Sequence, residues 1–385
     1  MENISSIEIS KFNKDETILN VSWKTLHELN NEETIRRVVP IVYLTILTLI
    51  GIPGNLLILY IYLAKFQKKA VHRTFVTTLA LVDLFVCCVA IPFEIVQMAH
   101  EYIFYSEILC KFGRTAKSLL TLLSALVLVA LSMNRFRRIC QPLKKQLTCQ
   151  QTLKCMGYMF FFAVLFSSAE LLLSGIRLHD LEHNLIGHDC SLSKEYINTI
   201  YLLVYSTVQL ILYIICMVSL IIMCFLIGRQ ILQHIKFRDQ FRLTRLVFSK
   251  RRNRTSMSTA TCIAGVNRES DPVNHSSNAN KYRRRSSSST KKRSPTKITR
   301  TAFTVSLCFI FVYFPYIVIG VLDATTEGDI IPNSDVASAV MPLLYRSHFI
   351  NNVVNFIIFV RMDTAFRKQC REISTDLFSL FFKRK

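Results

Sequence analysis

The sequence predicts an all-α membrane protein, a seven-transmembrane helix bundle, from its apolar runs and its composition. A bilayer-spanning helix needs about 20 mostly apolar residues. The 385-residue chain holds seven such runs and is 51% hydrophobic, with only 19% charged residues. A net charge of +21 beside long uncharged runs argues against a DNA-binding protein, whose charge would sit on a polar fold. The predicted spans are residues 38–64, 74–98, 109–136, 154–176, 197–228, 301–322 and 337–360.

The distribution of Lys and Arg predicts which side of the membrane each connecting segment faces. One set of alternate segments holds 7 basic and 17 acidic residues, and the other holds 34 basic and 6 acidic residues. Because Lys and Arg near the membrane are kept in the cytoplasm, we expect an extracellular amino terminus and a cytoplasmic carboxyl terminus. The outer set is residues 1–37, 98–110, 177–195 and 323–335, and the inner set is residues 65–73, 137–154, 234–300 and 361–385.

The segments outside the spans differ in composition. The polar tail 1–37 is expected to contain no cleavable signal peptide, because the first apolar run is too long for one. Its sequons at Asn3 and Asn20 could carry glycans. The basic third cytoplasmic loop, rich in Ser, Asn and Arg, is expected to be disordered and either to lie against anionic headgroups or to be regulated by phosphorylation. The predicted organisation is an outer tail (1–37), spans one to five (38–233), this loop (234–300), spans six and seven (301–360) and a cytoplasmic tail (361–385).

An ionisable residue at bilayer depth suggests a functional site, since its insertion costs about 2.5–3.5 kcal/mol. Asp83 lies in the middle of the second span, and other spans supply neutral oxygens near it. A carboxylate ringed by such oxygens suits a small hard cation, so Asp83, Ser124 and Asn351 could bind Na⁺. A protonated Asp83 in a plain hydrogen-bond network is the alternative. The further candidate partners are Asn55, Asn352 and Asn355.

Several short motifs occur in order on the predicted spans. They are Gly54–Asn55, LALVD ending at Asp83, Cys110 followed 25 residues later by Arg135 in NRFRRICQPL, Phe309 and Pro315 in FIFVYFP, and Asn355 of a degraded NPxxY. With these motifs the chain resembles, from about residue 38 to 373, the rhodopsin-like (class A) G-protein-coupled receptors. The resemblance implies a multi-pass protein of the plasma membrane and a short amphipathic eighth helix that starts near Phe366.

The resemblance implies roles for these residues. Arg135 would contact the G protein when the sixth span swings outward, with Pro315 as a hinge. Cys110 and Cys190 are the only cysteines expected on the oxidising side, so we expect them to form a disulfide that pins the second outer loop over the mouth of the bundle. Cys370 is a palmitoylation candidate. The remaining residues of the activation switch would be Asn134, Phe136, Phe309, Tyr313, Asn355 and Phe359.

The sequence departs from the family pattern at several of these positions. Asn134 replaces the usual Asp or Glu, so Arg135 lacks the adjacent charge that would restrain it at rest. We therefore expect raised basal signalling. Tyr313 replaces the usual Trp, and Phe359 replaces the Tyr of NPxxY and lacks its hydroxyl.

The expected ligand pocket contains a cation on the third span. Lys117 lies on the same inward stripe as Cys110 and Arg135, where an amine receptor of this family would have Asp. Its cationic side chain disfavours monoamine ligands. Glu94 is the expected neighbour of Lys117, and two readings remain open. The two side chains either neutralise each other or separate to bind a ligand's guanidinium and carboxylate.

The acidic outer segments would steer a basic ligand toward the pocket, which favours a small cationic peptide. We expect a neuropeptide receptor signalling through a heterotrimeric G protein, with arrestin and receptor kinases as further partners. A receptor for a lipid or other non-peptide ligand is the alternative, and a transporter is disfavoured because the spans show no internal repeat. No arrangement of catalytic groups appears, so we expect no enzyme and no cofactor except Na⁺. The expected ligand-binding residues are Glu94, Gln97, Lys117, Tyr205, Gln209, Tyr316, Tyr345 and His348.

Overall fold

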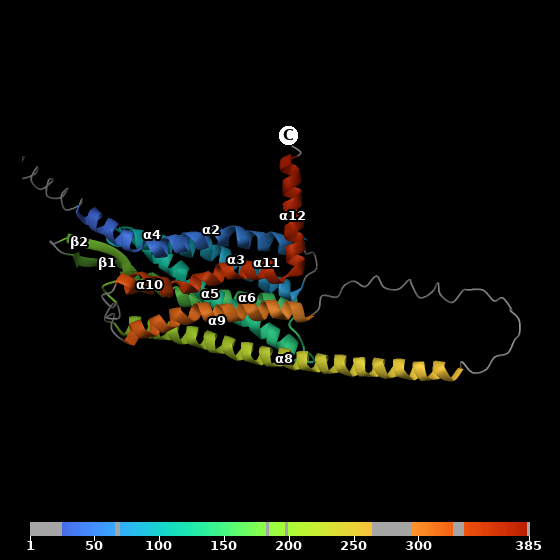
Figure 1. Ribbon diagram of the computed structural model, residues 1–385. Helices are drawn as coiled ribbons and strands as arrows, with labels where there is room; N and C mark the ends of the chain where they lie inside the picture. Colours follow the sequence, from blue (N-terminus) through green and yellow to red (C-terminus); the bar gives the residue numbers. More distant parts are fainter. Residues whose placement is uncertain are drawn as a thin grey trace, which may run out of the picture.

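The computed structural model is a bundle of long helices that run side by side, with a β-hairpin at one end and a helix crossing the other end (Figure 1). It describes residues 25–65, 70–181, 185–196, 199–263, 295–325 and 335–382. The fold prediction of a helical bundle is confirmed, and the hairpin was not predicted.

The first three spans match the apolar runs closely. Within the described residues, the first two contain short π-helical segments, whose wider turns take up one more residue than α-helical turns. The third is a single long helix. The elements are α2 (Val38–Tyr60) followed by η1 (Ile61–Lys65), then α3 (Val71–Phe85), η2 (Val86–Ala90) and α4 (Ile91–Ala99), then α5 (Glu107–Cys140).

The later spans are less regular. In the described residues, five helices are long and apolar enough to cross a membrane, and α9 adds a shorter apolar stretch, Phe303–Ile319. The seventh run is broken near Arg346 into two α-helices joined by a 3₁₀ turn. The elements are α6 (Cys149–Ser167), α7 (Glu170–Leu173), α8 (Ile200–Ile263), α9 (Pro295–Thr325), α10 (Asp335–Tyr345), η4 (Ser347–Ile350) and α11 (Asn351–Met362).

The eighth helix follows the bundle at a sharp angle. Ser347–Met362 and Thr364–Asp376 are bent by 91° relative to each other. The Asp363 carboxylate accepts hydrogen bonds from the backbone N–H groups of Ala365 and Phe366, which otherwise lack partners at a helix start. The helix α12 (Thr364–Phe382) therefore leaves the bundle nearly at a right angle to its axis (Figure 1).

The segment expected to form the third cytoplasmic loop is helical where the structure describes it. Helix α8 continues to Ile263, well past the end of the apolar run, and α9 already begins at Pro295. No Gly or Pro interrupts residues 229–263. Extending an existing helix also avoids the cost of a new nucleus, so a polar sequence can remain helical. Residues 234–263 and 295–300 of this segment are therefore helical in the structure, and residues 264–294 lie outside the described part.

Strands β1 (Ser174–Leu181) and β2 (Leu185–Leu192) form an antiparallel hairpin between the fourth and fifth spans. Cys190 on β2 pairs with Ile176 in the ladder and forms a disulfide with Cys110 at the start of α5. His188 also exchanges backbone hydrogen bonds with the segment around Ile103. The predicted disulfide is present, and it ties the hairpin to the helical bundle.

Helices α2 and α11 approach closely where Gly54 lies. A Cβ atom on Gly54 would come within 2.7 Å of the Phe356 ring, so only a glycine fits without displacing that side chain. The adjacent Asn55 is fully buried, and its amide donates to the Asn352 carbonyl on α11. Gly54 thus allows the first and seventh spans to pack closely, and Asn55 forms a hydrogen bond between them.

Part of the expected outer tail is ordered. Residues 25–36 are helical, and Asn30 is buried against the end of α4. Its side chain donates to the Ala99 carbonyl (2.9 Å) and accepts from the Tyr102 N–H (3.1 Å). Arg37 forms a two-pronged ion pair with Glu101. Burial raises the pKa of the Glu101 carboxyl above its usual range, although Arg37 acts to lower it.

Replacing Asn30 with alanine should destabilise the protein by about 2 kcal/mol, because two hydrogen bonds of about 1 kcal/mol each are lost. Thermal unfolding of the purified full-length chain measures the effect. Asn31→Ala is the matched control, since that side chain is exposed on the same helix. Equal melting temperatures for the two variants would show that the helix does not depend on this contact.

Candidate functional site

A polar cavity of about 130 Å³ lies inside the bundle among the ends of several helices. Six of the eight predicted ligand-binding residues line it. It is too small for a whole peptide, since pockets for drug-sized ligands measure about 300–1,000 Å³. It could therefore take one side chain or one chain end. The lining residues are Glu94, Arg114, Lys117, Ser118, Thr121, Glu170, Gln209, Tyr213, Tyr316, Tyr345 and His348.

Glu94 lies between two cations. One carboxylate oxygen accepts a hydrogen bond from Lys117 Nζ at 2.7 Å, and the other forms an ion pair with Arg346 Nη2 at 2.8 Å. The Glu94 side chain is 4% exposed, so the charges interact with little screening by water. The predicted pairing of Glu94 with Lys117 is present. Arg346 was missed, and because of it the three side chains carry a net charge of +1.

A second charged pair, Arg114 and Glu170, also lines the cavity. Glu170, on the short helix α7, accepts from the Ser174 hydroxyl at 2.8 Å and lies 3.6 Å from Arg114. Arg114 in turn donates to the Ser174 hydroxyl at 2.9 Å. Arg114 and Glu170 balance each other, so the cavity as a whole keeps the positive charge of the Glu94 group.

Two predicted ligand-binding residues do not line the cavity. The Gln97 amide donates to the Cys190 carbonyl at 2.7 Å and holds the hairpin. Tyr205 stacks on Phe166 with ring centroids 5.2 Å apart, and its hydroxyl lies 3.3 Å from Ser118 Oγ. Gln97 therefore supports the hairpin, and Tyr205 supports the wall of the cavity. Sequence periodicity alone does not distinguish such supporting side chains from side chains that line the cavity.

Asp83 lies deep in the bundle and accepts a hydrogen bond from the Asn355 amide at 2.7 Å. Asn351 donates to Ser124 at 3.4 Å beside it. Asp83 and Asn355 are therefore neighbours, as are Ser124 and Asn351. Several oxygens of this network have no hydrogen-bond partner among the described residues, namely Oδ1 of Asn55, Asp83, Asn352 and Asn355.

Arg135 is buried at the opposite end of α5 and is 6% exposed. Its guanidinium lies 2.5 Å from Nδ1 of His72 at the start of α3. Both amide atoms of the neighbouring Asn134 lack hydrogen-bond partners in the part of the chain that the structure describes. Arg135 therefore contacts a ring nitrogen of His72, a residue that lies outside the apolar run predicted for the second span.

Three other predicted switch residues lie in two aromatic clusters. Phe309 and Tyr313 stack with ring centroids 3.9 Å apart, and Tyr313 also contacts His348. Helix α9 runs through Pro315, and nearby the Ser347 hydroxyl donates to the Val312 carbonyl at 2.8 Å. The Phe359 ring is buried against the rings of Tyr62 and Phe366. This apolar environment suits a phenylalanine, which lacks the hydroxyl of tyrosine.

The remaining predicted sites lie at the periphery. Phe136 is half-buried on α5. Cys370 on α12 packs beside the cluster that contains Phe366, so its sulfur is partly covered. Asn3 and Asn20 lie outside the described residues.

The chain matches the model of a known protein family. The family model for the 7 transmembrane receptor (rhodopsin family) matches residues 54–359. This range runs from Gly54 to Phe359 and contains both charged clusters and the buried polar network.

The chain is also similar to several peptide receptors. It is 26% identical to the cholecystokinin receptor of Xenopus laevis over 204 residues, which cover 52% of this chain and 44% of that receptor. It is 28% identical to the neuromedin-U receptor 2 of Homo sapiens over 144 residues, 37% of this chain and 34% of that receptor. For the RYamide receptor of Tribolium castaneum the identity is 28% over 103 residues, 27% and 28% of the two chains. The matches thus span less than half of these relatives.

Proposed function

Since the chain belongs to the rhodopsin family of seven-transmembrane receptors, we propose that it is a multi-pass plasma-membrane receptor for a small peptide and activates a heterotrimeric G protein. The observation that carries this proposal is the charged cavity beneath a disulfide-linked hairpin. The similarity to receptors named for cholecystokinin, neuromedin U and RYamide supports a peptide ligand. Its amino terminus lies outside the cell and its carboxyl terminus in the cytoplasm.

The charge of the cavity indicates how the peptide enters. Glu94 already forms ion pairs with two cations, so a ligand guanidinium would have to displace Lys117 or Arg346. A carboxylate or carbonyl at the end of a peptide meets no such competition and can accept from either cation. The acidic outer segments, which hold 17 acidic and 7 basic residues, attract the peptide's basic side chains. The peptide therefore binds with an acceptor end inward and its positive charges outward.

A lipid with an acidic headgroup is the second candidate ligand. The same two cations would bind a phosphate or carboxylate, and the small volume of the cavity fits a headgroup. The acidic outer segments favour the peptide, because they repel an anionic lipid and attract a cationic peptide.

A ligand screen separates the two candidates. Cells expressing the full chain are exposed to synthetic neuropeptides and, in parallel, to lysophosphatidic acid, and G-protein activation is recorded. At least one basic peptide should activate the chain. Lys117→Gln should lower its potency by about ten- to thirtyfold, as expected when a hydrogen bond to a charged group worth about 1.5–2 kcal/mol is removed.

Lys111→Gln is the matched control for that variant. Lys111 pairs with Glu107 at the outer end of the same helix and does not line the cavity. Equal potencies for the two variants would contradict the acceptor-end binding mode. Activation by the acidic lipid alone would replace the peptide proposal with the lipid one.

The buried oxygens around Asp83 fit a sodium ion. One oxygen of the Asp83 carboxylate and the side-chain oxygens of Asn352, Asn355 and Asn55 accept no hydrogen bond among the described residues. Such a set matches the preference of small hard cations for oxygen. We place Na⁺ at Asp83 with Ser124 and Asn351 as further ligands, where it would keep the charge of Asp83 compensated.

The cytoplasmic end offers the contact for the G protein. Arg135 leaves His72 when α9 moves outward at Pro315, and its guanidinium then donates to carbonyl groups of the G protein. Arrestin and receptor kinases use the same exposed end. A palmitoyl chain on Cys370 holds α12 at the membrane surface, and glycans occupy Asn3 and Asn20 in the outer tail.

Asn134→Asp should lower ligand-free signalling by about tenfold. The new carboxylate lies next to Arg135 and forms a charge-assisted hydrogen bond worth about 1.5 kcal/mol in the resting state. Second-messenger output in cells without added ligand measures the effect at matched surface expression. Met133→Leu serves as control, because that side chain is exposed one position away. Equal baselines for Asn134→Asp and the unmodified receptor would remove the idea that Asn134 leaves Arg135 unrestrained.

A further inference from the structure

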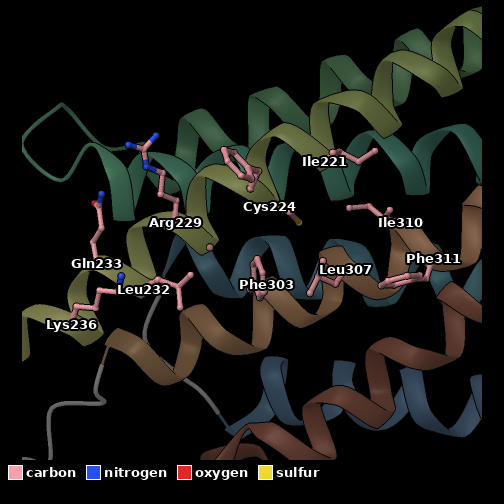
Figure 2. Close-up of a pocket in the computed structure, with 12 residues that line it drawn as sticks. Ile221, Cys224, Arg229, Leu232, Gln233, Lys236, Phe303, Leu307, Ile310 and Phe311 are labelled. Atoms are coloured by element: carbon pink, nitrogen blue, oxygen red, sulfur yellow. The ribbon is translucent and has the colours of Figure 1, made fainter. Parts of the chain in front are cut away.

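A second, larger cavity of about 790 Å³ lies between α8 and α9 near the end of the bundle that carries Arg135. Figure 2 shows apolar side chains from the two helices facing each other across it. Cys224 and Phe225 line the α8 side, and Phe303 and Leu307 line the α9 side. Several of the lining residues are largely exposed, including Phe225 at 68% and Phe311 at 74%, so the cavity opens to the outside of the bundle.

The cavity changes character along α8 at Arg229. Residues 200–228 contain no charged side chain, so Arg229 is the first charge after the membrane-spanning part of this helix. The apolar half of the cavity therefore lies at the depth of the lipid tails. Its rim, with Arg229, Gln233 and Lys236, lies at the depth of the headgroups.

The rim carries positive charge that the cavity does not balance. Arg229 and Lys236 are seven positions apart, two turns along one helix face, and no acidic residue lines the cavity. Among the side chains that the structure describes, neither cation forms an ion pair. Asp239, which follows in the sequence, lies outside those described side chains.

Gly228 leaves the space between the two helices open. A Cβ atom at this position would lie 3.5 Å from the Phe303 ring, which is ordinary contact, so alanine would fit and a larger side chain would project into the cavity. Because Gly228 has no side chain, the cavity stays open at the boundary between its apolar half and its cationic rim.

We propose that this cavity binds an anionic glycerophospholipid from the surrounding leaflet. An acyl chain lies against Cys224, Phe303 and Leu307, and the headgroup phosphate accepts from Arg229 and Lys236. The order of tail and headgroup in a membrane lipid matches the order of apolar wall and cationic rim along α8. Charge complementarity selects anionic lipid over zwitterionic lipid. The site is separate from the ligand cavity and does not depend on the identity of the ligand.

Native mass spectrometry of the full-length receptor, released from nanodiscs that contain phosphatidylserine or phosphatidylcholine of the same chain length, tests the proposal. The unmodified receptor should retain at least one phosphatidylserine more tightly than phosphatidylcholine. Arg229→Gln with Lys236→Gln should weaken phosphatidylserine retention about thirtyfold, since each cation near a membrane surface contributes about a factor of five. Equal retention of both lipids by the unmodified receptor would overturn the proposal.

Matched variants separate this site from lipid held non-specifically around the protein. Lys144→Gln with Lys145→Gln removes two exposed cations from another cytoplasmic segment and should leave retention unchanged. Gly228→Leu should displace the bound lipid by filling the cavity. Gly157→Leu makes the same change on α6, where a Cβ atom meets nothing within 4 Å, and should have no effect. Lipid loss in both glycine variants, or in neither, would show that the cavity does not hold the lipid.

Discussion

Replacing Glu94 with glutamine should destabilise the receptor by about 3–5 kcal/mol, the usual cost of removing one partner from a buried ion pair. Lys117 and Arg346 would then face each other without a carboxylate, in a site where Glu94 is 4% exposed. The amide of glutamine has a similar shape but can offer only one neutral oxygen. Thermal unfolding of the purified protein and surface expression in cells measure the loss.

Glu107→Gln is the matched control for Glu94→Gln. Glu107 also pairs with a lysine, Lys111, at 2.6 Å, but it is 61% exposed. Exposed pairs contribute about 0–1 kcal/mol, so this variant should unfold close to the temperature of the unmodified receptor. If both variants lost the same stability, the burial of the Glu94 group would not be the reason.

A triple variant separates the stability of this group from its role in ligand binding. Replacing Glu94, Lys117 and Arg346 together by methionine removes all three charges and leaves none unpaired. Buried ion groups replaced in this way often keep or regain stability. The triple variant should therefore recover most of the stability lost in Glu94→Gln but should not respond to the peptide. A normal peptide response would show that the cations do not contact the ligand.

Replacing Cys110 and Cys190 with serine should reduce stability by about 2–5 kcal/mol and sharply reduce peptide potency. The disulfide closes a loop of 80 residues that contains two spans and the hairpin. Without it the unfolded chain gains freedom, and the hairpin depends on hydrogen bonds such as those from Gln97 and to the backbone of His188. The hairpin should then leave the mouth of the cavity for part of the time.

Thermal unfolding and peptide potency are measured for Cys110→Ser with Cys190→Ser, with Cys88→Ser as the control. Cys88 is a free, exposed cysteine in the second span, so its loss tests the effect of the chemical change alone. Full potency in the double variant would mean that hydrogen bonds are sufficient to hold the hairpin in place.

The sequence was sufficient to predict the contacts that lie along regular helices. Lys117 follows Cys110 by two turns and faces inward, so its pairing with Glu94 could be expected. The neighbourhood of Asp83 and Asn355 was predicted in the same way, because apolar periodicity and motif spacing fix which face of a helix is buried.

Other contacts depend on local irregularities that periodicity does not report. Arg346 reaches Glu94 because the seventh span is broken by a 3₁₀ turn directly after it. His72 reaches Arg135 because α3 starts at Val71, three residues before the apolar run. The hairpin was not predicted. Its strands mix charged and apolar residues, and the segment was recognised only as the connection between the fourth and fifth spans.

The π-helical segment η2 lies within the second span, with Asp83 before it and Glu94 after it. Each residue of an α-helix turns the chain by about 100°. One residue gained or lost within such a segment would rotate the half that carries Glu94 by about that angle, while the half that carries Asp83 stayed in place. A single codon insertion or deletion would therefore change which side chain of this span lines the cavity and leave the hydrogen bonds around Asp83 unaltered.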